Sequence, residues 1–277
     1  MTSSDPPALT QPTQEHQDNT ARAQRRLRDR LLLLLAAVAG YTDAISYVAL
    51  GNVFAANMTG STVLLGVSLA QRDWSFAARA GVALGGFLVG VVIGAVLARR
   101  RQPSEIWPRT VTLALGVEAL TLALFSTLGA LLGTHDQHGS VYLLIGLAAC
   151  AMGIQSAAAR ALGVLDISTT YLTGTWVGLM AGLTRRLRAE VVAEVAEVAE
   201  AASDTQPEQM HEPPMPSIEP QRRDAFLLVV YFVAALLAGL LLVSATDTGV
   251  RAGLIPLAPA VGLVTLVALR RFHPTAA

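Results

Sequence analysis

Residues 25–62 read RRLRDRLLLLLAAVAGYTDAISYVALGNVFAANMTGST, and this stretch decides the fold. A cluster of arginines comes first, and an apolar block that contains one acid, Asp43, follows it. The block ends at a polar, glycine-containing stretch, after which apolar residues resume. About 20 apolar residues in a helix cross the hydrocarbon core of a bilayer, which is about 30 Å thick. The stretch therefore predicts a membrane-spanning helix, followed by a break.

The rest of the chain repeats this composition. Of its 277 residues, 53% are apolar and only 14% are charged. Because so many apolar blocks cannot be buried in one soluble core of this size, we predict an all-α integral membrane protein and exclude a soluble enzyme. The apolar blocks cover residues 31–50, 53–70, 76–98, 110–133, 141–165, 168–183, 225–245 and 252–269.

The arginines favour one topology over another. Cytoplasmic flanks of membrane helices carry an excess of Lys and Arg. If all eight blocks span, the arginines at 99–101 fall outside, and the arginine-free loop 134–140 falls inside. If the second and sixth blocks are short re-entrant or broken segments, both placements follow the rule. We therefore predict six transmembrane helices plus two such segments, with cytoplasmic N- and C-termini; eight spans is the alternative.

Two short matches indicate an internal repeat. Ala49-Leu50-Gly51 corresponds to Ala161-Leu162-Gly163, and Thr59-Gly60-Ser61 corresponds to Thr173-Gly174-Thr175. With three spans in each unit, the halves form an inverted 3+3 repeat, a recurring design of transporters. The predicted divisions are a disordered cytoplasmic tail (1–30), a first repeat (31–133), and a second repeat (134–277) with a cytoplasmic insertion (184–224).

The cytoplasmic insertion begins with a predicted amphipathic helix at Ala189–Ala202. Glu190 and Glu194 share one helical face, with Val191 and Val195 beside them. This segment is either a solvated acidic helix or a contact for a second copy or another partner.

The first block and its break resemble the bacterial YoaK family. The resemblance is carried by Gly40-Tyr41-Thr42-Asp43-Ala44, Ala49-Leu50-Gly51, Val53-Phe54 and Asn57-Met58-Thr59-Gly60-Ser61-Thr62. The chain departs from the family pattern at Ser61, where an asparagine is usual. The resemblance implies a bacterial inner-membrane protein. It supplies no substrate, because the family is of unknown function.

The candidate binding residues gather around the two breaks. Asp43 is either a proton or cation site, or a structural carboxylate tied to the neighbouring break. We expect it to lie beside the turn Asn57–Ser61, with the hydroxyls of Thr59 and Ser61 and the half-helix N–H groups as its nearest donors. A half-helix that starts inside the membrane presents free N–H groups and favours anions. The two half-sites are either facing ligand sites or ordinary helix caps. The residues of these half-sites are Asn57, Thr59, Gly60 and Ser61 in the first half, and Thr173, Gly174 and Thr175 in the second.

Two further polar residues lie inside predicted spans. Glu118 could be a second carboxylate of a proton relay, or it could satisfy a partner on another helix. Gln155 occupies about the repeat position of Asp43, with an amide in place of the acid. Any titrating site would then belong to one half only.

The leading functional hypothesis is a secondary transporter or channel for an unidentified small solute, coupled to protons through Asp43. The alternatives are a membrane scaffold or regulatory protein that acts through the insertion, and, less favoured, a membrane-embedded enzyme. We expect no cofactor, metal or nucleic acid, because no motif for any of them occurs. The expected partners are the lipid bilayer, a small solute and a second copy of the chain.

Overall fold

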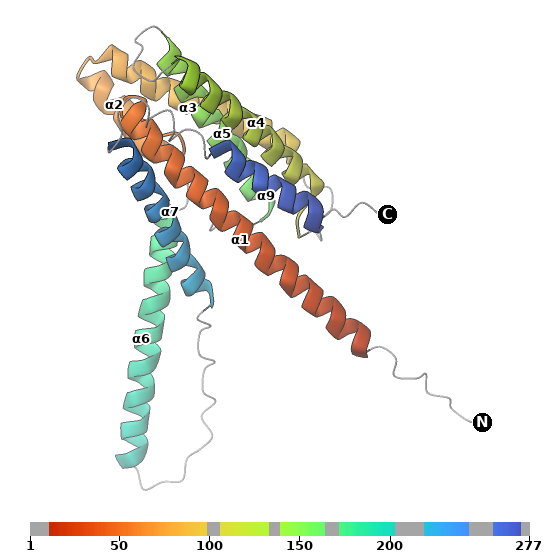
Figure 1. Ribbon diagram of the computed structural model, residues 1–277. Helices are drawn as coiled ribbons and strands as arrows, with labels where there is room; N and C mark the ends of the chain where they lie inside the picture. The colour runs from red at the N-terminus through yellow and green to blue at the C-terminus, as the bar shows by residue number, and fades with distance from the viewer. Residues whose placement is uncertain are drawn as a thin grey trace.

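The computed structural model describes residues 11–98, 106–132, 139–163, 172–202, 219–243 and 257–272. Within these ranges every regular element is an α-helix, which confirms the all-α prediction. Figure 1 shows a bundle from which α6 and the first part of α1 project. The helices are α1 (Gln11–Ala49), α2 (Met58–Ala70), α3 (Trp74–Leu97), α4 (Arg109–Leu132), α5 (Ser140–Ala161), α6 (Leu172–Ala202), α7 (Glu219–Val243) and α9 (Leu257–Phe272).

Within the described ranges, five helices are long and apolar enough to cross a membrane. They are the Asn19–Ala49 part of α1, all of α3, α4 and α5, and the Ala225–Leu242 part of α7. These match five of the six predicted spans. The sixth predicted span, 252–269, includes the 16-residue α9, and its first residues lie outside the described ranges. The chain is therefore a multi-spanning membrane protein.

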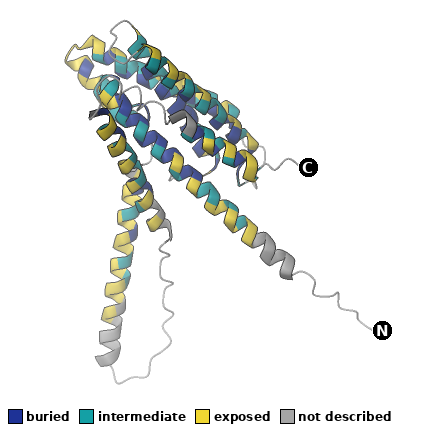
Figure 2. Cartoon of the chain, viewed as in Figure 1, coloured by how far each residue is buried: buried dark blue, intermediate teal, exposed yellow. Residues whose placement is uncertain are grey.

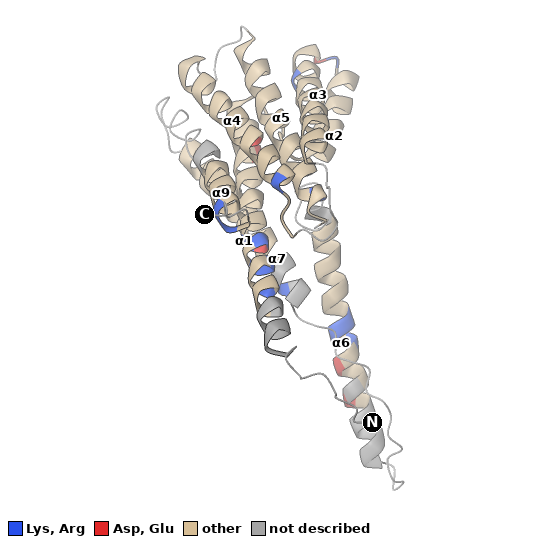
Figure 3. Cartoon of the chain, turned by 90° about the vertical axis from the view of Figure 1, so that its right-hand side faces the viewer, with Lys and Arg blue, Asp and Glu red and all other residues tan. Residues whose placement is uncertain are grey.

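The outer faces of the bundle are apolar. Leu88 on α3 is 63% exposed, and Leu120 and Leu131 on α4 are 71% and 73% exposed. Figure 2 shows such exposed positions along the outer helices, with buried residues between the helices. Figure 3 shows few charged residues within the bundle, arginines toward the lower ends of α1 and α9, and arginines midway along α6. Lipid is the environment that such a continuous apolar surface requires.

The two short predicted segments differ from each other. The 13-residue α2 is about 20 Å long at 1.5 Å per residue, too short to cross a bilayer alone. The block predicted at 168–183 is not a separate element, because α6 runs without a break from Leu172 to Ala202. The predicted amphipathic helix at 189–202 is the end of α6. No Gly or Pro interrupts residues 184–202, so the helix propagates from one block into the next.

The disordered tail predicted for residues 1–30 is wrong from Gln11 onward. The first helix begins at Gln11 and continues into the span as one element. Residues 21–30 consist mostly of Ala, Arg, Gln and Leu, which are good helix formers. Extending an existing helix costs much less than nucleating one, so the span propagates outward. Residues 1–10 lie outside the described part.

The two matched Ala-Leu-Gly stretches end corresponding helices. Ala49 is the last residue of α1, and Ala161 is the last residue of α5. The glycine two positions later is left-handed in both places, with φ of 89° at Gly51 and 70° at Gly163. Glycine adopts this conformation without the steric cost that other residues meet. The same local signal therefore ends the first helix of each repeat.

Glycines let α3 and α5 approach very closely. A Cβ atom at Gly86 would lie 2.7 Å from the carbonyl oxygen of Gly146, and one at Gly90 would lie 2.0 Å from that of Cys150. One turn later, Gly94 faces Ile154 in the same way. Small residues at four-residue spacing allow such contact between membrane helices. Because residue numbers rise together along both helices, α3 and α5 run parallel.

The helix directions agree with an inverted repeat. Figure 1 shows α1 and α3 running in opposite directions. Because α5 is parallel to α3, α5 runs opposite to α1, its counterpart in the repeat. The packing pairs follow the same symmetry, since α1 packs on α7, α3 packs on α5, and α4 packs on α9.

We predict that Gly90→Ala destabilises the protein by about 1–3 kcal/mol, because the added methyl group overpacks the α3–α5 contact. The matched control is Gly85→Ala, where a Cβ would meet nothing within 4 Å. Alanine favours helix over glycine by up to about 1 kcal/mol, so the control should be neutral or stabilising. Thermal unfolding of the purified variants in detergent measures the difference. Equal melting temperatures would contradict the close approach.

Candidate functional site

The centre of the candidate site is the break between α1 and α2. After Gly51, Asn52 is also left-handed, with φ of 64°, and the chain turns back toward α1. The segment that returns toward α1 is buried: Val53 and Ala56 are 0% exposed, and Ala55 is 2% exposed. The break therefore lies inside the protein, where water does not satisfy its backbone N–H groups.

The carboxylate of Asp43 satisfies these N–H groups. Its Oδ1 accepts hydrogen bonds from the backbone N–H groups of Ala55 at 2.9 Å, Ala56 at 2.6 Å and Asn57 at 3.4 Å. Asp43 is only 4% exposed. Hydrogen bonds to an ionised acceptor are stronger than neutral ones, and several on one oxygen hold the segment in one position. The predicted proximity of Asp43 to the break is confirmed.

The backbone donors agree with the sequence prediction, whereas the side-chain donors do not. The sequence predicts donors to Asp43 both from the half-helix N–H groups and from the hydroxyls of Thr59 and Ser61. Instead, the Ser61 hydroxyl donates to the carbonyl oxygen of Phe54 at 3.0 Å, and Thr59 is exposed. The Asn57 side chain caps α2 by accepting from the N–H of Gly60 at 3.2 Å. These three side chains shape the start of α2, and their role in ligand binding stays a prediction.

Gly60 has a steric role. A Cβ there would lie 2.9 Å from the Phe54 ring and 3.0 Å from the Asn57 amide. The Phe54 ring in turn stacks on Tyr47 of α1, with ring centroids 5.2 Å apart. Glycine is therefore required where the aromatic pair covers the first turn of α2.

Sequence reasoning missed Tyr231 on α7. Its hydroxyl donates to the Oδ2 atom of Asp43 at 2.7 Å. Gly40 makes this approach possible, because a Cβ there would lie 2.6 Å from the Tyr231 carbonyl oxygen. A tyrosine hydroxyl inside a protein usually has a hydrogen-bond partner. The presence of Tyr231 in an otherwise apolar block could therefore have predicted a polar contact with another helix. Asp43 therefore joins α1, the α2 break and α7 at one point.

Glu118 and Gln155 lie elsewhere in the bundle. Glu118 on α4 is 0% exposed, and neither carboxyl oxygen has a hydrogen-bond partner among the described residues. The Gln155 amide donates to the carbonyl oxygen of Leu35 at 2.9 Å, which links α5 to α1. Its Oε1 atom has no partner in the described part of the chain. Neither residue contacts Asp43 by a hydrogen bond.

The second predicted half-site is described only in part. Gly174 is exposed and Thr175 is buried, both in the first turn of α6. The side chain of Thr173 and residues 164–171 lie outside what the structure describes. The hypothesis of two facing half-sites thus stays a prediction.

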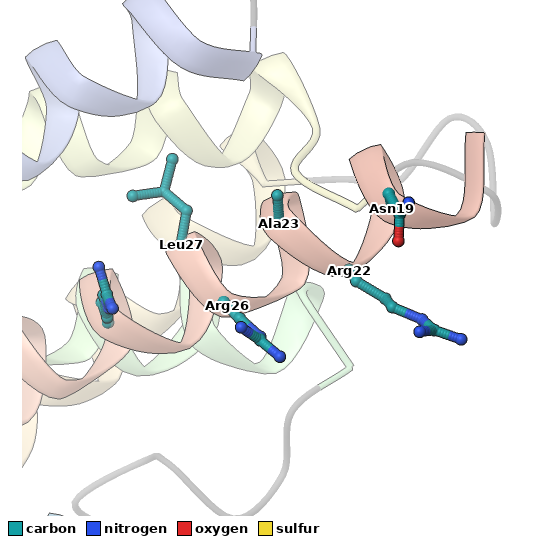
Figure 4. Close-up of a pocket in the computed structure, with 6 residues that line it drawn as sticks. Asn19, Arg22, Ala23, Arg26 and Leu27 are labelled. Carbon is teal, nitrogen blue, oxygen red and sulfur yellow. The ribbon is translucent and has the colours of Figure 1, made fainter. Parts of the chain in front are cut away.

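A groove of about 360 Å³ lies along the projecting part of α1. Arg22, Arg26 and Arg30 line it, together with Asn19, Ala23 and Leu27. Figure 4 shows Arg22 and Arg26 extending from the same side of the helix. All six residues belong to one helix, so the groove lies between long side chains and encloses no built site. Among the described residues, no group of three His, Cys, Asp or Glu side chains could hold a metal ion.

Comparison with known proteins agrees with this architecture. The chain is 40% identical over 160 residues to the UPF0700 transmembrane protein YoaK of Bacillus subtilis (strain 168), which covers 58% of this chain and 69% of the relative. No solved structure matches the chain. Residues 31–269 match the family model described as Protein of unknown function (DUF1275). This match covers the break and all or most of every candidate membrane helix, so the chain belongs to the DUF1275 family and resembles YoaK.

Proposed function

We propose that the protein is a secondary transporter or channel for a small solute in the bacterial inner membrane. The observation that carries the proposal is the buried break of α1–α2, held by one carboxylate at the contact between the two repeats. Interrupted helices in inverted repeats are where transporters bind their substrates. Irregular backbone at this depth is tolerated only in contact with protein or along a water-filled cavity.

The position of Tyr231 connects the break to the second repeat. Asp43 and the break belong to the first repeat, whereas Tyr231 belongs to α7 of the second. Alternating access commonly moves one repeat against the other. Such a motion would change the distance between the Tyr231 hydroxyl and Asp43, and with it the support of the break. Asp43 therefore serves as the anchor of the solute site.

We predict that Asp43→Asn abolishes ligand binding and reduces solute flux at least about tenfold. An amide offers one acceptor oxygen in place of two, and each hydrogen bond to a charged group is worth about 1.5–3 kcal/mol. A thermal-shift screen of the purified protein against small metabolites identifies the ligand, and uptake into proteoliposomes measures flux. Saturating ligand, at about 100 times its Kd, should stabilise the wild type by about 2.7 kcal/mol.

Ser46→Ala is the matched control for this experiment. Ser46 is buried one turn after Asp43, and its hydroxyl has no partner among the described residues. The control should retain the ligand-induced stabilisation and the flux. If the ligand stabilises Asp43→Asn as strongly as the wild type, Asp43 is a structural residue only.

The proposed topology has cytoplasmic N- and C-termini, and Gln71 distinguishes it from eight spans. Gln71 lies in the exposed turn between α2 and α3. A cysteine at Gln71, in a Cys150→Ala background, should react with an impermeant maleimide from outside whole cells. With eight spans it would lie in the cytoplasm. Arg188→Cys is the control, because both topologies place it inside, where it should react only after the cells are permeabilised.

The second candidate function is a scaffold that acts through α6. The projecting part of α6 exposes three apolar side chains at helical spacing, Leu187 among the arginines at 185–188 and Val191 and Val195 after them. An apolar face of this kind suits a second copy of the chain or another helix. A scaffold would keep its function in Asp43→Asn and lose it when residues 189–202 are deleted, which is the opposite of what a transporter requires.

A further inference from the structure

Glu118 is, with Asp43, one of the two buried acids among the described residues, and the break does not use it. It lies on the buried face of α4, between Leu115 and Leu122, each of which is also fully buried. A charged side chain in the membrane interior is costly unless donors or opposite charges surround it. Asp43 has four donors, whereas both oxygens of Glu118 have none among the described residues.

Gln155 lies at the same depth as Glu118. The packed helices α4 and α5 are joined by a short connection, so they run in opposite directions. Glu118 lies about 14 residues before the end of α4, and Gln155 lies about 15 residues after the start of α5. At 1.5 Å per residue, both lie about 21–23 Å from that connection. The interior thus holds three oxygen atoms without donors among the described residues at about this level, two from Glu118 and one from Gln155.

The number of unpartnered oxygen atoms near Glu118 indicates whether a metal cation or a proton is the ligand. Hard metal cations are surrounded by about six oxygen ligands in proteins, whereas Glu118 and Gln155 together supply three. A proton requires only one carboxyl oxygen. We propose that Glu118 is the site that binds and releases the coupling proton of the transporter, a role that rests on the function proposed above. Gln155 places an amide oxygen at this level and adds no second charge.

No charged or titratable side chain of the helices packed on α4 pairs with Glu118 in the described ranges. The helices that pack on α4 are α5, α9 and α3. Their charged or titratable side chains in the described ranges are Tyr142, Cys150 and Arg160 on α5, Arg270 and Arg271 on α9, and Arg79 on α3. None of them forms a hydrogen bond or ion pair with Glu118. The α9 arginines lie at the end of that helix, beside Phe272, whose ring stacks on Trp107 before the start of α4.

Infrared spectroscopy of the protein in liposomes tests the inference with the proton alone as ligand. The wild type should show the carbonyl stretching band of a buried protonated carboxyl, and the band should decrease reversibly in alkaline buffer. Glu118→Gln should lose this band, and Glu118→Asp should shift it. Asp43→Asn and Gln155→Leu should retain a band of this kind, because the acid of α4 is still present.

A band that persists in full in Glu118→Gln, or that disappears in Asp43→Asn instead, overturns the inference. If Glu118→Gln does not fold, an unshifted band in Glu118→Asp overturns it equally. The spectrum requires no solute, so its failure is distinct from a failure of the transport assay. With a solute in hand, Glu118→Gln should lose the acceleration of uptake by a pH gradient and retain solute exchange without a gradient.

Discussion

The structure depends on one requirement: the backbone N–H groups of the α1–α2 break must find acceptors inside a membrane. Water and a regular helix supply acceptors elsewhere, but neither is available at Ala55 and Ala56. A single carboxylate can accept several hydrogen bonds at once, which no hydroxyl or amide does as well. Asp43 therefore fixes where α2 begins and, through Tyr231, where α7 lies against α1.

The close α3–α5 contact forms the second part of the framework. The glycines of α3 and α5 bring the two backbones together without side chains between them. In lipid, where apolar burial gives little driving force between helices, this contact supplies dispersion energy over a long, rigid seam. In an inverted repeat α5 runs opposite to α1, its counterpart. Because α3 also runs opposite to α1, α3 and α5 are parallel. The seam thus holds the repeats together, whereas the contact at Asp43 is a single polar link.

The sequence predicted the membrane class, six spans of which the structure bears out five, and the proximity of Asp43 to the break, because each follows from local composition and helix length. It also predicted backbone N–H groups of the half-helix as donors to Asp43, but it did not predict Tyr231. The nearest donors are backbone N–H groups, which every residue carries, and Tyr231 lies 188 residues away in the chain. The extent of α6 was also missed, because the arginines at 185–188 mark a membrane boundary but do not end a helix. Membrane position and helix termini are separate properties, and only the first can be read from charge.

The two repeats share a backbone plan but differ in polar chemistry. Gly40 approaches the backbone of Tyr231 in one half, and Gly153 approaches the backbone of Phe87 in the same way in the other. Tyr231 contacts Asp43, whereas Phe87 has no hydroxyl, and Gln155 takes the place of the acid. The amide of Gln155 instead reaches Leu35 of the first repeat. Duplication alone would give equal polar contacts in the two halves. A carboxylate contact on one side and a neutral amide contact on the other make the two contacts between the halves unequal in strength, because hydrogen bonds to an ionised acceptor are stronger than neutral ones.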